Sequence, residues 1–173
     1  MWSETTRSFP VSSNSERSCS VDVAPIRAEP SDAAEQVTQA VRGEPIRVEE
    51  ERGEWARVRT AYEYPGWIRM SSLGPPAVGN WLPGPDGGNA LEQARAFLGA
   101  PYEWGGMTER GVDCSGLVHM AYRRTGRLIP RDADQQEEAG EPIDEHDLRP
   151  GDLACYGDHI AFWAGEGLSL IHI

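Results

Sequence analysis

Apolar and polar positions alternate along most of the stretch from residue 21 to residue 73, after a polar start to the chain. A period of two is the spacing of half-buried strands, and glycine-containing turns separate the successive runs. The expected strands lie at residues 37–40, 46–50, 55–60 and 66–69. Several short strands within about fifty residues predict a small all-β barrel.

The apolar spacing becomes helical after a segment rich in proline and glycine. Asn89 is a helix-capping residue type, and the apolar stripe that follows it stops at Gly99. Further helices are expected at 115–125 and 133–139, followed by strands at 152–156 and 159–163 with a tight turn between them. Helices first and strands afterwards are typical of an α+β domain and not of alternating βαβ units.

Charge and composition exclude several function classes. A formal charge of −12 and an isoelectric point near 4.7 argue against a nucleic-acid partner, because phosphates bind basic surfaces. No run approaches the roughly 18 apolar residues of a membrane span, and residues 1–20 lack the apolar core of a signal peptide. We therefore expect a cytoplasmic protein, or a secreted one if the N-terminus is incomplete. The sequence leaves the oligomeric state open.

The cysteines do not form a metal-binding or disulfide pattern. Cys19, Cys114 and Cys155 are odd in number and widely spaced along the chain. The sequence also has no glycine-rich loop followed by Lys-Ser or Lys-Thr, which would cradle a phosphate. We therefore expect neither a metal nor a cofactor.

Cys114 stands where the second of the expected helices begins. A thiol at a helix N-terminus feels the positive end of the helix dipole, which favours the thiolate. Downstream, His159 opens an apolar run, and a histidine brought beside a thiol can deprotonate it. A lone cysteine is more often a small buried hydrophobe, but polar Asp113 and Ser115 flank this one at the helix start. These positions favour an enzyme with a cysteine nucleophile.

Five motifs in this order resemble those of the NlpC/P60 cysteine peptidases. They are residues 101–106 (PYEWGG), 113–117 (DCSGL), 130–136 (PRDADQQ), 148–153 (LRPGDL) and His159. Residues 21–73 are similar to a bacterial SH3-type domain, which often precedes that catalytic domain. The subgroup most similar is the γ-D-glutamyl-L-diamino-acid endopeptidases, which cut cell-wall peptides during recycling. The resemblance implies an α+β papain-like NlpC/P60 domain preceded by a small all-β SH3-like barrel.

The resemblance implies three catalytic roles. Cys114 matches the nucleophile and His159 matches its base. Tyr102 matches a tyrosine whose hydroxyl lies near the oxyanion site, where a donor would stabilise the tetrahedral intermediate.

Substrate-binding roles are implied for five other residues. Asp113, Ser115 and Asp132 match residues that line the substrate groove of the subgroup, although each of these types also caps helices. Glu29 and Tyr64 resemble the carboxylate and tyrosine with which the SH3-type domain reads the free amino terminus of the peptide. The alternative is that Tyr64 is a turn aromatic and Glu29 a solvated side chain.

His172 is the candidate for the third catalytic residue, which orients the base in this family. That residue commonly falls twelve positions after the base, which here is Ile171. The closing string LSLIHI, residues 168–173, is identical to the in-frame translation of a transposon adapter used in DNA sequencing libraries. We therefore expect the natural protein to continue beyond Gly167 in place of this string.

The resemblance divides the chain into five segments and implies one function. The segments are a disordered tail (1–20), an SH3-type barrel (21–74), a linker (75–89), an incomplete catalytic domain (90–167) and an adapter-derived tail (168–173). The implied function is a cysteine endopeptidase that hydrolyses the γ-D-glutamyl–diamino acid bond of peptidoglycan peptides with a free N-terminal L-Ala. Two alternatives stay open, namely an amidase or acyltransferase with the same pair, and a non-catalytic wall-peptide-binding protein.

Overall fold

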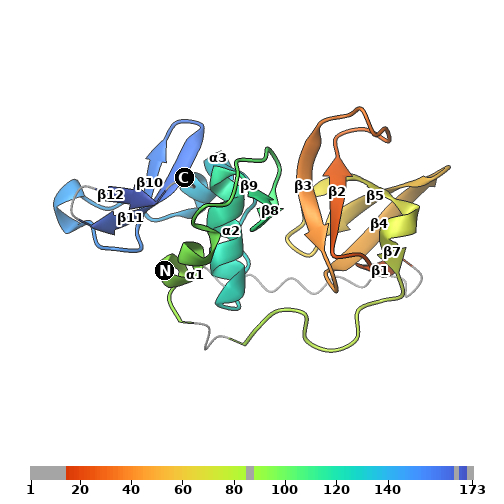
Figure 1. The fold of residues 1–173 in the computed structure, drawn as a ribbon, viewed down its shortest axis with the longest axis horizontal. Coiled ribbons are helices and arrows are strands. Elements are labelled where there is room, and N and C mark those ends of the chain that lie inside the picture. The colour runs from red at the N-terminus through yellow and green to blue at the C-terminus, as the bar shows by residue number, and fades with distance from the viewer. Residues whose placement is uncertain (1–14, 85–87, 166–167, 171–173) are drawn as a thin grey trace. The chain divides into compact units, whose positions relative to one another are not determined.

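A computed structural model of the chain describes residues 15–84, 88–165 and 168–170 (Figure 1). It separates into two compact units, with the division between Trp81 and Leu82. We call the first the all-β unit (residues 15–81) and the second the α+β unit (residues 82–170). The division falls inside the segment 75–89 that the sequence marks as a linker.

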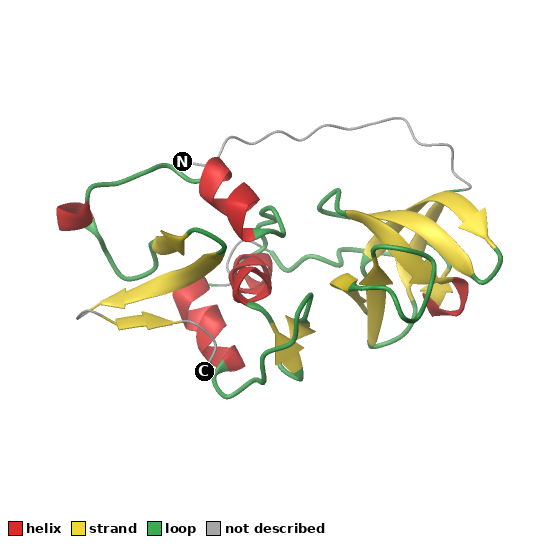
Figure 2. Ribbon diagram, turned by 90° about the horizontal axis from the view of Figure 1, so that it is seen from above, coloured by secondary structure: helices red, strands yellow, loops and turns green. Residues whose placement is uncertain are grey.

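One antiparallel sheet of seven strands, in the order β3-β2-β6-β5-β4-β1-β7, forms the all-β unit. The strands are β1 (Glu16–Cys19), β2 (Val23–Arg27), β3 (Gln36–Val41), β4 (Pro45–Arg52), β5 (Trp55–Thr60), β6 (Pro65–Arg69) and β7 (Leu73–Gly74), with the 3-10 turn η1 (Met70–Ser72) before β7. The sheet curls on itself (Figure 2), which confirms the small all-β barrel predicted from the alternating pattern.

The interior of the all-β unit follows the period of two. Ala56 and Val58 of β5 are fully buried, while Arg57 between them is exposed. Gly53 closes the β4–β5 hairpin with a φ of +61°, a backbone conformation that glycine adopts without strain. Other buried side chains of this interior are Cys19, Ala24, Ile26, Ala40, Ile46 and Ile68.

Three strands of the all-β unit lie outside the segments predicted as strands, namely β1, β2 and the two-residue β7. β1 occupies part of the tail expected over residues 1–20, where it pairs with β4 and β7 and buries Cys19 in the interior. β2 contains Pro25, which has no N–H for a ladder. The proline is tolerated because β6 pairs with β2 only at Arg27.

The described part of the α+β unit has three α-helices and five short strands in two small sheets, which confirms the α+β class. Its elements are α1 (Ala90–Ala94), η2 (Arg95–Phe97), β8 (Met107–Thr108), β9 (Gly111–Val112), α2 (Cys114–Arg124), α3 (Ala133–Ala139), η3 (Glu145–Asp147), β10 (Leu153–Tyr156), β11 (His159–Gly165) and β12 (Leu168–Leu170). β10, β11 and β12 form one antiparallel sheet in that order, and β8 pairs with β9. The predicted helix 133–139 is confirmed at both ends.

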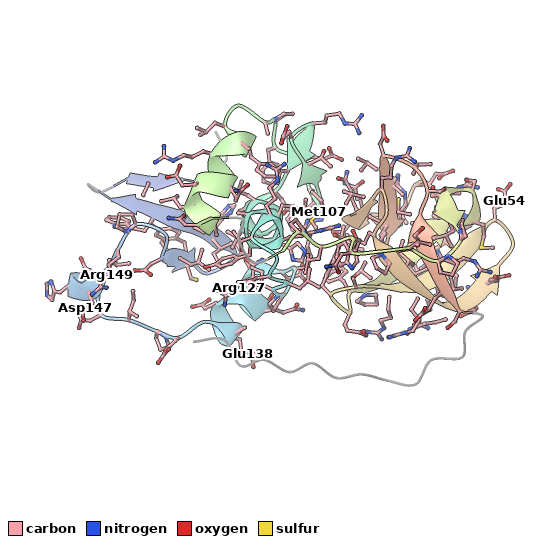
Figure 3. All side chains as sticks on the ribbon, turned by 90° about the horizontal axis from the view of Figure 1, so that it is seen from below. Glu54, Met107, Arg127, Glu138, Asp147 and Arg149 are labelled. Carbon is pink, nitrogen blue, oxygen red and sulfur yellow. The ribbon has the colours of Figure 1, made fainter. Side chains whose placement is uncertain are left out.

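Helix α2 is the centre of the α+β unit. It packs against α1, α3, β8 and β11, and Figure 1 shows it between the β8–β9 hairpin and the β10–β12 sheet. Met107 of β8 is fully buried beside it (Figure 3). The helix ends at Arg124, and Gly126, two residues later, has a φ of +80°, the left-handed conformation typical of a helix stop. Within the described residues, no helix is both long and apolar enough to cross a membrane.

Candidate active site

Cys114 is the first residue of α2, which begins one residue before the predicted helix 115–125. Its side chain is buried, with 6% of the residue exposed. The preceding residue, Asp113, has an extended backbone, and its carboxylate accepts a hydrogen bond from the Gly116 backbone N–H at 2.7 Å. Asp113 therefore caps the helix whose positive end bears the thiol, an arrangement that suits a thiolate nucleophile.

The Asp113 carboxylate also holds the segment that precedes the hairpin. Its Oδ2 atom accepts hydrogen bonds from the Gly105 backbone N–H at 2.7 Å and from the Arg131 guanidinium at 2.8 Å. Ser115 Oγ donates to Oδ1 at 3.4 Å and accepts from Arg131 at 2.8 Å. The structure thus gives Asp113 and Ser115 intramolecular partners, and their contact with substrate stays a prediction.

Gln136 of α3 supports the same network from the other side. Its Nε2 atom donates to the backbone carbonyl oxygens of Ser115 at 3.0 Å and of Pro130 at 2.8 Å. Gln136 is fully buried. Arg131 and Gln136 both lie in the motif PRDADQQ, and neither had a predicted role. Their polar side chains within that motif were the available signal.

The backbone of Tyr102 lies beside the segment that leads into α2. It forms a parallel bridge with Val112, two residues before Cys114. Partial desolvation of the hydroxyl raises the pKa of Tyr102, and the negative charges of Asp113, a Cys114 thiolate and Asp158 raise it further, against the opposing charge of Arg131. The hydroxyl therefore keeps its proton at neutral pH.

His159 is the first residue of β11, and its side chain is exposed. It faces Tyr156 across a tight turn at Gly157-Asp158, and this turn confirms the predicted one. β11 packs on α2, the helix that bears the thiol. The pairing of the His159 imidazole with that thiol stays a prediction.

Asp132 and His172 are the remaining predicted residues of the α+β unit. Asp132 occupies the N-cap position of α3, but its side chain accepts no capping hydrogen bond there. Its predicted contact with substrate is not tested by this position. His172 lies outside the described residues, while residues 168–170 form β12 beside β11. The third catalytic residue and the origin of the closing string therefore stay predictions.

Glu29 and Tyr64 come together at one end of two neighbouring strands of the all-β unit. β2 ends at Arg27, which pairs with Trp67 of the antiparallel β6, so the residues after β2 and before β6 share an edge. Glu29 is exposed in the loop after β2, and Tyr64 is half-buried just before β6. The Tyr64 ring lies 6.3 Å from that of Tyr62, centroid to centroid. A carboxylate and an aromatic ring at one edge can bind a small cation.

Two protein-family models match the chain. The model of the NlpC/P60 family matches residues 99–172, and that of the bacterial dipeptidyl-peptidase Sh3 domain matches residues 26–73. These ranges fall within the two units, the first covering most of the α+β unit and the second most of the all-β unit.

Curated relatives show the same likeness, and a solved structure of lower similarity is given with them. The gamma-D-glutamyl-L-lysine dipeptidyl-peptidase of Bacillus cereus is 35% identical over 101 residues, which are 54% of this chain and 30% of that protein. The probable endopeptidase NlpC of Escherichia coli K12 is 41% identical over 83 residues, covering 47% of this chain and 50% of that protein. A crystal structure of a NlpC/P60 family protein from Bacillus cereus matches 91% of this chain and 54% of that chain, with 25% identity and a TM-score of 0.47. The chain spans half or less of the length of these two curated relatives.

Proposed function

The chain belongs to the NlpC/P60 family and carries a bacterial SH3 domain, and on this premise we propose that it is a cysteine peptidase of peptidoglycan peptides. The proposed reaction is hydrolysis of the bond between γ-D-glutamate and the diamino acid. The observation that supports the proposal is the position of Cys114 at the capped start of α2, a helix on which β11, the strand that begins at His159, packs. The names of the relatives support the substrate class.

The proposed chemistry proceeds through an acyl-enzyme. His159 takes the thiol proton, and the Cys114 sulfur attacks the carbonyl carbon of the γ-glutamyl amide. Tyr102, whose raised pKa keeps it protonated, donates to the oxygen that becomes negatively charged. The protonated His159 then gives its proton to the departing amine, and the carbon–nitrogen bond breaks. Water, deprotonated by His159, hydrolyses the thioester and regenerates the thiol.

Substrate selection in this proposal begins at the all-β unit. The Glu29 carboxylate binds the ammonium group of an N-terminal L-Ala, and Tyr64 provides an aromatic face beside it. Supporting this role, Glu29 is exposed at the same strand edge as Tyr64. A carboxylate at the amino end selects peptides that are already free of the glycan, because an acylated amine carries no charge.

Hydrolysis of L-Ala-γ-D-Glu-L-Lys by the full chain, followed by mass spectrometry, tests the function. We expect release of L-Ala-γ-D-Glu and free lysine, and loss of turnover in Cys114→Ala with peptide binding retained. Cys155→Ala is the matched control, since Cys155 of β10 has no role in the proposed steps, and it is expected to cleave normally. Peptide binding by the wild type without any cleavage would instead make the chain a wall-peptide-binding protein.

A second substrate separates the peptidase from an amidase or acyltransferase that uses the same pair. The peptide with an α-linked D-Glu in place of the γ-linked residue has the same composition but places the scissile carbonyl differently. We expect cleavage of the γ-linked peptide only. Equal cleavage of both, or transfer of the acyl group to an added amine in preference to water, contradicts the proposed specificity.

A further inference from the structure

Arg131 is a buried cation without a role in the reaction described above. Only 1% of the residue is exposed, although arginine is rarely buried unless it is paired. It follows Pro130 in the segment between α2 and α3, and it contacts Asp113, the residue before Cys114. The partners of the guanidinium group should therefore explain why this charged side chain is buried.

The guanidinium of Arg131 donates hydrogen bonds to both residues that flank the nucleophile in the chain. Nη2 donates to Asp113 Oδ2 at 2.8 Å, and Nη1 donates to Ser115 Oγ at 2.8 Å. Nη2 also reaches the Gly106 carbonyl oxygen at 3.4 Å. A planar group with two donors fixes both partners at once, which the flexible point charge of lysine does not do. Cys114 lies between the two held residues in the chain.

The ion pair between Arg131 and Asp113 also balances the charge beside the Cys114 thiol. Asp113 is 6% exposed, so its carboxylate is a nearly desolvated negative charge next to Cys114 in sequence. A negative charge at that place opposes formation of a second one on sulfur. The Arg131 cation, paired with this carboxylate, offsets that opposition. Both charges also act on the nearby Tyr102 hydroxyl, in opposite directions.

We propose that Arg131 is a positioning residue of the Cys114 site, which fixes the two flanking residues and neutralises the Asp113 carboxylate so that the thiolate can form. The proposal rests on the proposed role of Cys114 as the nucleophile. Asp113 is then a helix cap whose charge is tolerated beside a thiolate only because Arg131 pairs with it. The pair acts as one neutral unit.

The test is the pH dependence of Cys114 alkylation by iodoacetamide in the full folded chain. Trypsin cuts after Arg110 and Arg123, so mass spectrometry of peptide 111–123 reports on this thiol separately from the other two cysteines. Arg131→Met leaves the Asp113 charge unbalanced, and Asp113→Asn leaves the Arg131 charge unbalanced while keeping a good capping residue. The double variant removes both charges.

The alkylation midpoints of the two single variants are expected to shift in opposite directions. The midpoint of the alkylation profile should rise by about one pH unit in Arg131→Met and fall by up to about one unit in Asp113→Asn. The double variant should return close to the wild-type midpoint. A purely structural role predicts instead that both single variants shift in the same direction and that the double variant shifts at least as far. That result, or the absence of any shift, overturns the proposal.

Folding failure of Arg131→Met does not remove the test. The Asp113→Asn variant and the double variant leave no buried carboxylate unpaired, and their midpoints alone decide the outcome. A lower alkylation midpoint in Asp113→Asn, together with a wild-type midpoint in the double variant, supports the proposal. Equal midpoints in these two variants overturn it. Because alkylation needs no turnover, a chain that shows these shifts but cuts no peptide refutes the proposed function and not the role of Arg131.

Discussion

His119 of α2 directs its Nδ1 atom to the carbonyl oxygen of Pro130, 3.4 Å away, and the imidazole is fully buried. Burial, followed by the charges of Arg131 and Arg123, lowers the pKa of His119 from its ordinary 6.5 to about 3. The ring is therefore neutral in the folded protein at every pH at which the protein is expected to work. Protonation of the His119 ring therefore destabilises the folded state.

The first prediction is a loss of stability in mild acid that depends on His119. The folded-state pKa lies below the unfolded one, so the unfolded chain binds more protons between pH 6.5 and about 3. Stability is full above pH 6.5 and falls as the pH drops through that window. At pH 5 the loss due to this group is about 2 kcal/mol in the free energy of unfolding.

Urea unfolding at pH 7 and pH 5 measures this effect. In His119→Gln the fall between the two pH values should be smaller than in the wild type by that amount, whatever the absolute stability of the variant. His146→Gln is the control because His146 is exposed, and it should keep the wild-type fall. An unchanged fall in His119→Gln would disprove the assignment.

The second prediction concerns the close packing at Gly116, within the first turn of α2. A Cβ atom there would lie 2.3 Å from the Gly106 carbonyl oxygen, a backbone atom that cannot turn aside. Helix propensity favours alanine by about 1 kcal/mol, but overpacking of this kind costs about 3 kcal/mol, so Gly116→Ala is expected to lose about 2 kcal/mol. Thermal unfolding of the Gly116→Ala variant measures this loss of stability. Gly84→Ala, where a Cβ meets no atom within 4 Å, should unfold like the wild type.

The third prediction compares two adjacent glutamines of α3. Gln136→Leu removes the donor that serves the Ser115 and Pro130 carbonyl oxygens, which should lower the free energy of unfolding by about 2 kcal/mol. Gln135 is exposed on the same helix, so Gln135→Leu provides a matched control with the same chemical change. Urea unfolding of the two variants should separate them. Similar losses in both would mean that the buried contacts contribute little.

The fourth prediction concerns the proposed recognition of the peptide amine by Glu29. In Glu29→Gln the KM for a peptide with a free N-terminal L-Ala should rise about tenfold, because one charge-assisted hydrogen bond is lost. The KM for the N-acetylated peptide should not change. Glu51→Gln, an exposed glutamate of β4, is the control and should leave both values unaltered. An equal rise for free and acetylated peptides contradicts the assignment.

Local signals made the helices of the α+β unit predictable. Asp113 and Gly126 bound α2 through a side-chain cap and a left-handed stop, and each of these acts over only a few residues. The same holds for the β5 strand, where Ala56 and Val58 alternate with exposed arginine. Such features depend on the chain near them, so a sequence pattern is enough to find them.

Contacts between distant segments could not be predicted in the same way. β1 is a strand because β4 and β7 pair with it, and its own sequence has too few apolar residues to show a period. Arg131 is a charged residue that a composition rule places on the surface, but it pairs with Asp113, 18 positions earlier. The family resemblance named the residues around the thiol, and the structure supplied the network behind them.

The backbone bridge between Tyr102 and Val112 has a consequence for how this segment tolerates change. The glycines at 106 and 111 leave no room for a side chain, since a Cβ on either would lie within 2.5 Å of a neighbouring atom. The loop between the bridged residues therefore has a set length as well as a set composition. Insertion or deletion of a single residue there would move the phenol relative to the sulfur even if every named side chain were kept, so alignments of related chains should show gaps elsewhere but not in this loop.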